Sequence, residues 1–221
     1  MEDLSEVHLT EYIPTIYTSP RTIYYTQNGK QRKWHIMAER NGVVIVLYNS
    51  TRDVLILVKQ FRASAYIHQI PEEERTKKPI DVKKYPPNLG ITYEFCAGLE
   101  DKNISTAETA REEILEECGY EVTLDQLEKI ATIKNLSETT GARSTFYYCE
   151  VTDEMRLNHG GGNEEEGENI EVVEMPVEEV LRFTTNREYV PCPINFMFGL
   201  YWFLNNKYHT KYASCYSLFL V

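Results

Sequence analysis

The 221-residue sequence lacks any run of 18 or more apolar residues, so it contains no candidate for a membrane-spanning helix. Its start, MEDLSEVHLT, lacks the basic region and apolar stretch of a secretory signal. Its five cysteines have no close paired spacing, which disfavours a zinc site and favours reduced thiols. A net charge of −11 argues against nucleic acid as a bulk partner. We therefore expect a cytoplasmic protein without a membrane or nucleic-acid partner.

Length and composition allow one large core with a small accessory segment. The chain is 42% hydrophobic, which is typical of a globular enzyme domain. Residues 1–33 contain short extended pieces with several tyrosines and threonines, and residues 28–29 predict a turn between strands. Residues 34–207 are expected to form the main domain, and residues 208–221 a tail with an apolar end.

Apolar patterns indicate the elements of the main domain. Strands are expected at residues 34–48, 54–61, 91–100, 144–151 and 171–175, and helices at residues 177–182 and 195–205. Residues 67–90 are rich in proline and charge and predict a long surface loop. Strands interleaved with helices predict an α/β fold.

A further helix is predicted between Ser105 and Gly119. Ser105 and Glu108 have the S-x-x-E spacing of a capping box, in which each residue satisfies the other's backbone N–H. Gly119 suits the left-handed position just past a helix end. The apolar residues that recur at helical intervals form a narrow packing face and are Ala107, Ala110, Ile114 and Cys118.

Four carboxylates crowd the second half of this helix, at Glu112, Glu113, Glu116 and Glu117. The last three fall within an arc of about 100°. At a separation of about 6 Å and an effective dielectric near 20, each like-charged pair costs about 3 kcal/mol. Either the stripe is fully solvated or a cation binds it. By pattern alone, a solvated acidic face is the commoner arrangement.

The flanking sequence favours the cation. The strand expected at residues 91–100 ends in a glycine loop just before the helix, so loop carbonyls lie near the glutamates. Hard divalent cations prefer carboxylate and carbonyl oxygens, and Mg²⁺ keeps several waters while binding few carboxylates and substrate phosphates. A loop carbonyl with two or three helix glutamates therefore suits Mg²⁺, with Mn²⁺ as the alternative.

Residues 98–120 resemble the Nudix box, G-x5-E-x7-R-E-U-x-E-E-x-G-U, where U is a bulky apolar residue. Residues 113–119 match E-U-x-E-E-x-G at every specified position. Two positions depart, because Ile104 replaces the first glutamate and Glu112 replaces the arginine. That arginine normally steadies the box through salt bridges, so its loss alters the local electrostatics.

The resemblance covers most of residues 34–207. The segments ILVKQFRASAY, YEFCAGL, EECGY and GGGNEEEGENIEVVEMP resemble the nucleoside-diphosphate-sugar branch of Nudix hydrolases. The resemblance implies a Nudix α/β/α sandwich with a mixed sheet, and an N-terminal β-rich segment that helps the chain to form a homodimer.

The same resemblance implies Mg²⁺-dependent hydrolysis of the diphosphate of a nucleotide sugar, with UDP-glucose giving UMP and glucose 1-phosphate. One alternative is an ADP-ribose diphosphatase that gives AMP and ribose 5-phosphate. Another is a Nudix-like module that binds a nucleotide without hydrolysing it, and Ile104 and Glu112 keep that alternative open.

Metal ligands follow from the resemblance residue by residue. In the family, the first and last glutamates of R-E-x-x-E-E bind Mg²⁺ most directly, which assigns Glu113 and Glu117 here. Glu116 lies close by and is an auxiliary to metal binding and catalysis. The carbonyl of the residue before the first glycine, Ala97, often joins them.

A loop with three glycines, at residues 160–168, is expected to supply the general base. In the ADP-ribose-like branch, the base comes from a flexible acidic loop beyond the box. The matching residues are Glu168 as the expected base and Glu166 as its substitute. Glycines allow such a loop to close over a substrate. The alternative is an ordinary solvated acidic loop.

Four further residues are candidates for substrate binding. Arg62 follows the strand pattern, and its guanidinium fits a phosphate bidentately. Glu94 lies on the strand that leads to the box and is a candidate for contact with substrate or metal. For both residues the alternative is an ordinary solvent-exposed side chain. Trp34 is a candidate for stacking on a base, with packing as the alternative, and Arg143 for approach to the sugar or phosphate.

Overall fold

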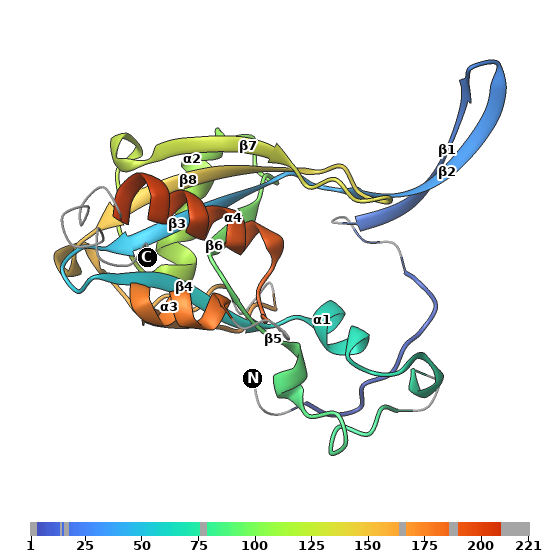
Figure 1. Ribbon diagram of the computed structural model, residues 1–221, viewed down its shortest axis with the longest axis horizontal. Coiled ribbons are helices and arrows are strands. Elements are labelled where there is room, and N and C mark those ends of the chain that lie inside the picture. The colour runs from blue at the N-terminus through green and yellow to red at the C-terminus, as the bar shows by residue number, and fades with distance from the viewer. Residues whose placement is uncertain are drawn as a thin grey trace, which may run out of the picture.

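The computed structural model describes residues 4–13, 15, 18–75, 79–163, 167–185 and 190–208. A seven-stranded mixed sheet forms the body, and a two-stranded antiparallel hairpin projects from it (Figure 1). The strands are β1 (Thr18–Gln27), β2 (Lys30–Glu39), β3 (Gly42–Asn49), β4 (Val54–Phe61), β5 (Ile91–Glu94), β6 (Cys96–Leu99), β7 (Glu128–Lys134), β8 (Arg143–Val151) and β9 (Ile170–Pro176). In the sheet the order is β5-β4-β3-β8-β7, with β6 beside β3 and β9 beside β4.

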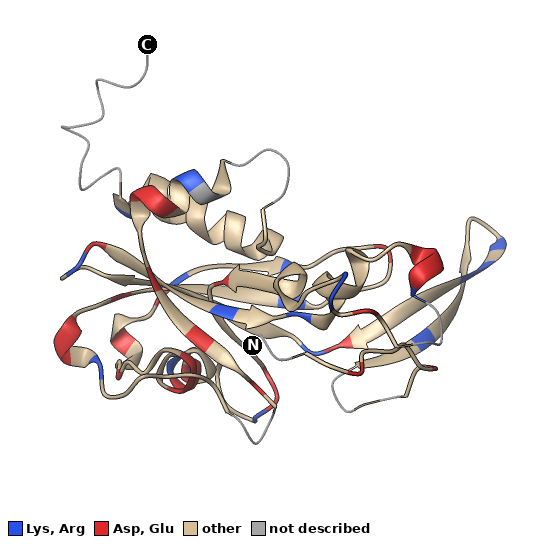
Figure 2. Cartoon of the chain, turned by 90° about the horizontal axis from the view of Figure 1, so that it is seen from below, with Lys and Arg blue, Asp and Glu red and all other residues tan. Residues whose placement is uncertain are grey.

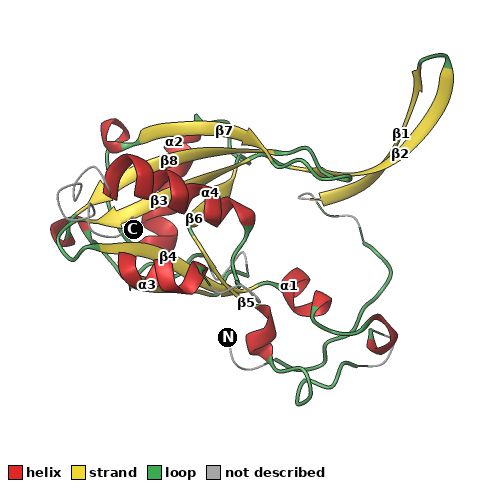
Figure 3. Ribbon diagram, viewed as in Figure 1, coloured by secondary structure: helices red, strands yellow, loops and turns green. Residues whose placement is uncertain are grey.

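Helices cover both faces of this sheet (Figure 3). They are α1 (Ala63–His68), α2 (Thr106–Glu113), α3 (Val177–Thr184) and α4 (Ile194–Phe203). Short 3₁₀ turns occur at η1 (Glu72–Glu74), η2 (Pro87–Gly90), η4 (Leu124–Gln126) and η5 (Asp153–Met155), and π-helical turns at η3 (Ile114–Cys118) and η7 (Leu204–Tyr208). In the described part of the chain, none of the helices has the length and apolar character needed to cross a membrane.

Alternating side chains of β3 face two separate cores, as the period of a strand requires. Val44 lies in a core with Phe196 of α4 and residues of α3, whereas its neighbour Val43 lies in a core with Ile114 after α2. One core therefore lies on each side of the sheet. This arrangement confirms the predicted α/β/α sandwich with a mixed sheet.

The hairpin of β3 and β4 opens as it leaves its turn. Near the turn, Leu47 pairs with Ile56, but farther along β4 pairs with β5 and β3 pairs with β6. The strand expected at residues 91–100 is therefore two strands that cross from β4 to β3, with a break at Phe95. Phe95 is buried and stacks on Phe196 at 4.6 Å between ring centres. The crossing places Gly98 opposite Val43.

The strand expected at residues 34–48 is also two strands. Its first part belongs to β2, which pairs with β1, and β3 starts at Gly42 after a break at Arg40 and Asn41. Both halves have strand-forming side chains, so the apolar pattern alone does not reveal the break. The N-terminal hairpin thus extends to Glu39, beyond residue 33. Its predicted turn is present, with positive φ at Asn28 (53°) and Gly29 (73°).

Other departures concern helices and loops. Helix α1 is not among the elements predicted from the sequence. Tyr66 of α1 forms a small core with Ile70 and Ile80 of the segment expected as a surface loop. The 3₁₀ turns satisfy backbone groups locally in this segment. Basic residues at the tip of the hairpin contrast with the acidic segments spread over the body (Figure 2).

Candidate active site

A cavity of about 510 Å³ opens where β3, β6 and the end of the α2 helix meet. The predicted site residues that line it are Arg62, Glu94, Ala97, Glu113, Glu116, Glu117 and Glu168. They come from four separate parts of the chain, which the sheet order brings together. Trp34 and Arg143 do not line this cavity, and Glu166 lies outside the described residues.

The glutamate helix has the predicted ends. Ser105 Oγ accepts the N–H of Glu108 at 3.2 Å, and a Glu108 carboxylate oxygen accepts the N–H of Ser105 at 2.8 Å. Gly119 ends the helix with φ of 77°. Within it, α2 changes to the π turn η3, which no sequence signal indicated. Such turns are rare in proteins overall, and those that occur are often found at functional sites. Along η3, Glu117 is buried and Glu116 is exposed.

Glu117 is the most deeply buried glutamate of the stripe, with 2% of its surface exposed. Its Oε2 accepts the backbone N–H of Ala97 at 2.9 Å. Burial raises the pKa of Glu117 to about 8, although the hydrogen bond from Ala97 favours the ionised form. An ionised carboxylate at this depth is costly unless a positive charge compensates it.

Glu113 lies directly against the backbone of Gly98. A Cβ added at Gly98 would lie 1.9 Å from Glu113 Oε1, so any other residue would collide with this carboxyl. Burial, reinforced by the charges of Glu116 and Glu168, raises the pKa of Glu113 to about 8. The glycine of the box is thus a steric requirement of the glutamate pair.

These carboxyls fit a divalent cation. Among the described residues, no three acidic, histidine or cysteine side chains form a complete metal-binding group. Mg²⁺ does not need one, because it retains several waters and binds one or two carboxylates plus substrate phosphates. The charge of Lys102 lowers the pKa of Glu113 without offsetting its burial, and a bound cation would add the positive charge that favours both ionised carboxylates. The assigned carbonyl ligand at Ala97 stays a prediction.

Glu168 lies at the base of the glycine loop, half-buried and close to the other carboxylates. Its Oε2 accepts the N–H of Asn163 at 2.9 Å, and its own N–H donates to the Asn163 carbonyl at 3.1 Å. A Cβ at Gly162 would lie 2.6 Å from Glu168 Oε2. The charge of Glu168 contributes to the raised pKa of both Glu113 and Glu117. The loop therefore brings a carboxylate to the glutamate pair.

Arg62 and Glu94 contact each other rather than standing apart. Arg62 Nε donates to Glu94 Oε1 at 2.8 Å, and Nη2 donates to Oε2 at 2.7 Å. Thr92 Oγ1 also donates to Glu94 Oε1, at 2.7 Å. The hydrogen bonds to Glu94 are the largest cause that raises the pKa of Arg62. Glu94 thus orients the guanidinium, and a phosphate would meet its Nη1 side.

The two departures from the box lie at its outer edge. Lys102 Nζ lies 2.6 Å from Glu112 Oε2, so the arginine position of the box still forms an ion pair, here as the acidic partner of a lysine that precedes the helix. Both side chains are largely solvent-exposed, and such pairs contribute about 0–1 kcal/mol. Ile104 is exposed. The departures therefore leave Glu113 and Glu117 in place.

Trp34 and Arg143 anchor other parts of the chain. Trp34, on β2, is 47% exposed, and its Nε1 donates to the carbonyl of Glu138 at 2.6 Å. Arg143 is exposed, and its backbone N–H donates to Asn41 Oδ1 at 3.0 Å. Both contacts join the hairpin region to the β7–β8 connection. Substrate roles for the two residues stay predictions.

One polar cluster on the cavity wall has no signal in the sequence. Asn135 Nδ2 donates to Ser144 Oγ at 2.8 Å, and Asn195 Nδ2 does so at 3.4 Å. All three residues line the cavity from the β7–β8 connection, from β8 and from α4. Uncharged polar residues of this kind are common on surfaces, so only their convergence identifies them. They can hydrogen-bond a neutral polar part of a ligand.

Relatives of known function cover nearly the whole chain. The chain is 36% identical over 214 residues to uridine diphosphate glucose pyrophosphatase NUDT14 of Bos taurus, covering 93% of this chain and 96% of the relative. It is 33% identical over 198 residues to the protein of the same name in Mus musculus, covering 86% and 89%. GDP-mannose pyrophosphatase of Salmonella typhimurium is 30% identical over 177 residues, covering 78% and 81%.

Structural comparison supports the same fold. A solved structure described as an ADP compounds hydrolase superposes with a TM-score of 0.59 at 16% identity, covering 91% of each chain. No protein-family model matches the chain. The sequence identity to the pyrophosphatases extends over most of both chains. It is consistent with the box glutamates that line the cavity. This chain belongs to the Nudix hydrolase family.

Proposed function

We propose that this protein hydrolyses the diphosphate of UDP-sugars, converting UDP-glucose to UMP and glucose 1-phosphate. The observation that carries the proposal is the pair of carboxyls with raised pKa, Glu113 and Glu117, on the wall of a 510 Å³ cavity. The choice of nucleotide sugar rests on the pyrophosphatase relatives, which include a GDP-mannose as well as two UDP-glucose enzymes.

Membership of the family implies dependence on a divalent metal, and we propose Mg²⁺, with Mn²⁺ as a substitute. A bound divalent metal polarises phosphoryl oxygens and lowers the pKa of water. Glu113 and Glu117 would hold it, helped by Glu116 and the carbonyl of Ala97. The hydrogen bond from the Ala97 N–H holds Glu117 Oε2 against the strand that carries the proposed carbonyl ligand.

The remaining residues position the substrate and move a proton. We propose that Glu168 accepts the proton of the attacking water while a new P–O bond forms and the bridging P–O bond breaks. The departing phosphate keeps the electron pair of the broken bond. Arg62, oriented by Glu94, would bind a diphosphate oxygen through its Nη1 side. Asn135, Ser144 and Asn195 would face a neutral part of the nucleotide sugar.

One assay separates this proposal from its competitors. The purified protein is incubated with UDP-glucose, GDP-mannose or ADP-ribose and Mg²⁺, and the products are resolved by ion-exchange chromatography. We expect UMP and glucose 1-phosphate to form fastest. Faster release of AMP from ADP-ribose would favour the ADP-ribose diphosphatase. Binding of nucleotide without any product would favour the non-catalytic module.

We also propose a cytoplasmic homodimer that has neither a membrane nor a nucleic-acid partner. The hairpin exposes apolar and aromatic side chains at Ile23, Tyr24, Tyr25 and Trp34, which a second subunit would cover. The described cysteines have no disulfide, which agrees with a reducing compartment. Light scattering after size-exclusion chromatography tests the mass, and a monomer at micromolar concentration would refute the dimer.

A further inference from the structure

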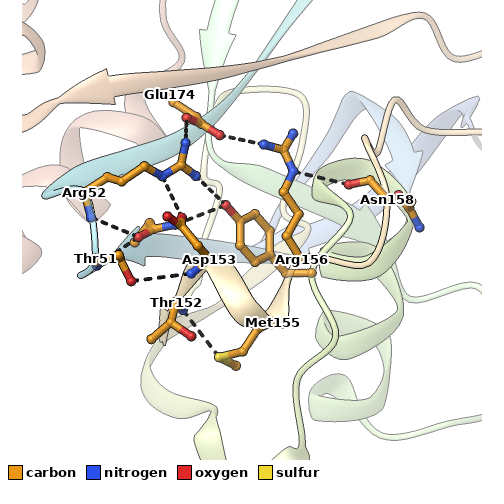
Figure 4. A network of polar contacts seen from close by, with 10 residues as sticks. Thr51, Arg52, Thr152, Asp153, Met155, Arg156, Asn158 and Glu174 are labelled. Atoms are coloured by element: carbon orange, nitrogen blue, oxygen red, sulfur yellow. Dashed lines mark hydrogen bonds and ion pairs between the residues drawn. The ribbon is translucent and has the colours of Figure 1, made fainter.

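A polar network centres on Arg156, the residue that follows η5 (Figure 4). Its Nη1 donates to Glu174 Oε1 on β9 at 2.8 Å, and its Nε donates to the carbonyl of Asn158 at 3.2 Å. The guanidinium also lies 5.8 Å from the centre of the Tyr120 ring. One side chain thereby joins the sheet, the last residue of the box, and the segment that leads into the glycine loop.

Asn158 carries this connection into the loop. Its backbone N–H donates to the carbonyl of Gly119, at 3.2 Å, and its Oδ1 accepts the N–H of Gly160 at 2.7 Å. The fit is tight, because a Cβ at Gly119 would lie 2.3 Å from the Asn158 carbonyl oxygen. A Cβ at Gly160 would lie 2.2 Å from the Glu117 carbonyl oxygen. The loop backbone therefore packs directly on the end of the glutamate helix.

The backbone amides of the next two loop residues donate to the backbone carbonyls of the helix glutamates. Gly161 N–H donates to the carbonyl of Glu117 at 2.9 Å, and Gly162 N–H donates to that of Glu116 at 3.2 Å. These carbonyls lie at the end of a helix, where no further helical turn supplies an N–H donor for them. The same loop holds Glu168 six residues later in the chain than Gly162. Glu168 is hydrogen-bonded to Asn163, the residue next to Gly162, so these contacts connect the metal-site glutamates to the base.

We propose that Arg156 is a positioning residue, which holds the glycine loop on the glutamate helix and so sets Glu168 relative to Glu117. This inference rests on the proposed hydrolysis and on Glu168 as its base. A displacement of reacting groups by about 1 Å can cost about 100-fold in rate. Loss of the Arg156 contact to Asn158 weakens the attachment of the loop to the helix without removing any group that touches substrate.

Arg52 is the matched control, because it belongs to the same network without touching the loop. Its Nε lies 2.7 Å from Asp153 Oδ1, and its Nη2 donates to the Tyr120 hydroxyl at 3.1 Å. It also forms an ion pair with the other oxygen of Glu174. R52K and R156K each replace a planar guanidinium with a single ammonium group. The ammonium cannot donate hydrogen bonds to two partners in the geometry of the guanidinium. Only R156K affects Asn158.

The test measures UDP-glucose hydrolysis at saturating Mg²⁺ for the wild type, R156K and R52K. For R156K we expect kcat to fall about 10-fold or more with KM changed by less than about 3-fold, which is the pattern of a lost transition-state arrangement. R52K should keep kcat within about 3-fold, with a melting temperature lowered as much as that of R156K. R156Q, which keeps an amide donor without the charge, repeats the test independently.

Hydrogen exchange reads the loop directly. In R156K the amides of Gly161 and Gly162 should exchange faster than in the wild type and in R52K, because the loop that carries them is held less firmly on the glutamate helix. Equal kcat losses in R156K and R52K, or unchanged exchange at these glycines, would overturn the positioning role. A wild-type protein with no activity on any nucleotide sugar would refute the hydrolysis itself and this role with it.

Discussion

Gly98→Ala tests the steric basis of the glutamate pair with a single methyl group. The added Cβ would lie 1.9 Å from Oε1 and 2.0 Å from the carboxyl carbon of Glu113. Ordinary contact begins at 3.4 Å, so the carboxyl must retreat by about 1.5 Å (3.4 − 1.9). The φ of Gly98 is not in the left-handed range, so alanine adds no backbone strain. The whole effect therefore acts on the position of Glu113.

A retreat of this size takes Glu113 out of the geometry that a metal shared with Glu117 requires. Because misplacement by about 1 Å can cost about 100-fold in rate, we expect kcat with UDP-glucose to fall by about 100-fold or more. The Mg²⁺ concentration for half-maximal activity should rise as well. Glu113 is only partly buried and can rotate outward, so the melting temperature should change little.

Steady-state kinetics across a Mg²⁺ titration, with thermal unfolding of the same samples, provide the measurement. Gly141→Ala is the control, because a Cβ at Gly141 meets nothing within 4 Å and its φ is also not positive. G141A should behave as the wild type does. If G98A kept kcat and the Mg²⁺ midpoint within about 3-fold of G141A, the inference that Glu113 must lie against Gly98 would be refuted.

The remaining predictions concern individual carboxyls and the metal. Glu117→Gln should lower kcat by about 100-fold or more, as does loss of a principal electrostatic group, and near-normal kcat would remove Glu117 from the ligands. Glu168→Gln should lower kcat more than it changes substrate affinity, measured by titration calorimetry, and the reverse pattern would make Glu168 a binding residue. EDTA should abolish turnover and added Mg²⁺ restore it, whereas turnover unchanged by EDTA would disprove metal dependence. Without metal, the melting temperature should fall as pH rises from about 5 to about 8, because Glu113 and Glu117 ionise near 4.5 when unfolded and near 8 when folded. Mg²⁺ should raise the melting temperature most at pH 8. An increase in melting temperature that is the same at every pH would contradict this linkage.

The pairing of Arg62 with Glu94 illustrates what sequence reasoning missed. Each residue was predicted separately as a substrate contact, yet they lie 32 positions apart in the chain and form one bidentate pair. The antiparallel pairing of β4 with β5 makes this contact possible, because it places Arg62, which directly follows β4, and Glu94, the last residue of β5, on neighbouring strands. Side-chain chemistry identified both residues, but only strand pairing showed that one orients the other.

Local interactions explain what the sequence by itself determined. The capping box of Ser105 and Glu108 and the left-handed Gly119 depend on neighbours within a few residues, so the glutamate helix and its ends were predictable. Alternating burial along β3 follows equally from the strand period. The resemblance to the box then predicts Glu113 and Glu117 as metal ligands.

The tertiary structure decided which distant residues meet at those glutamates. The fork of β3 and β4 brings Gly98 against Glu113, and the glycine loop folds back so that Gly161 binds the carbonyl of Glu117. The π turn η3 and the polar cluster at Ser144 also depend on packing between elements far apart in the chain. Such contacts follow from sheet order and loop closure, whose free energies are set by the whole fold rather than by nearby residues.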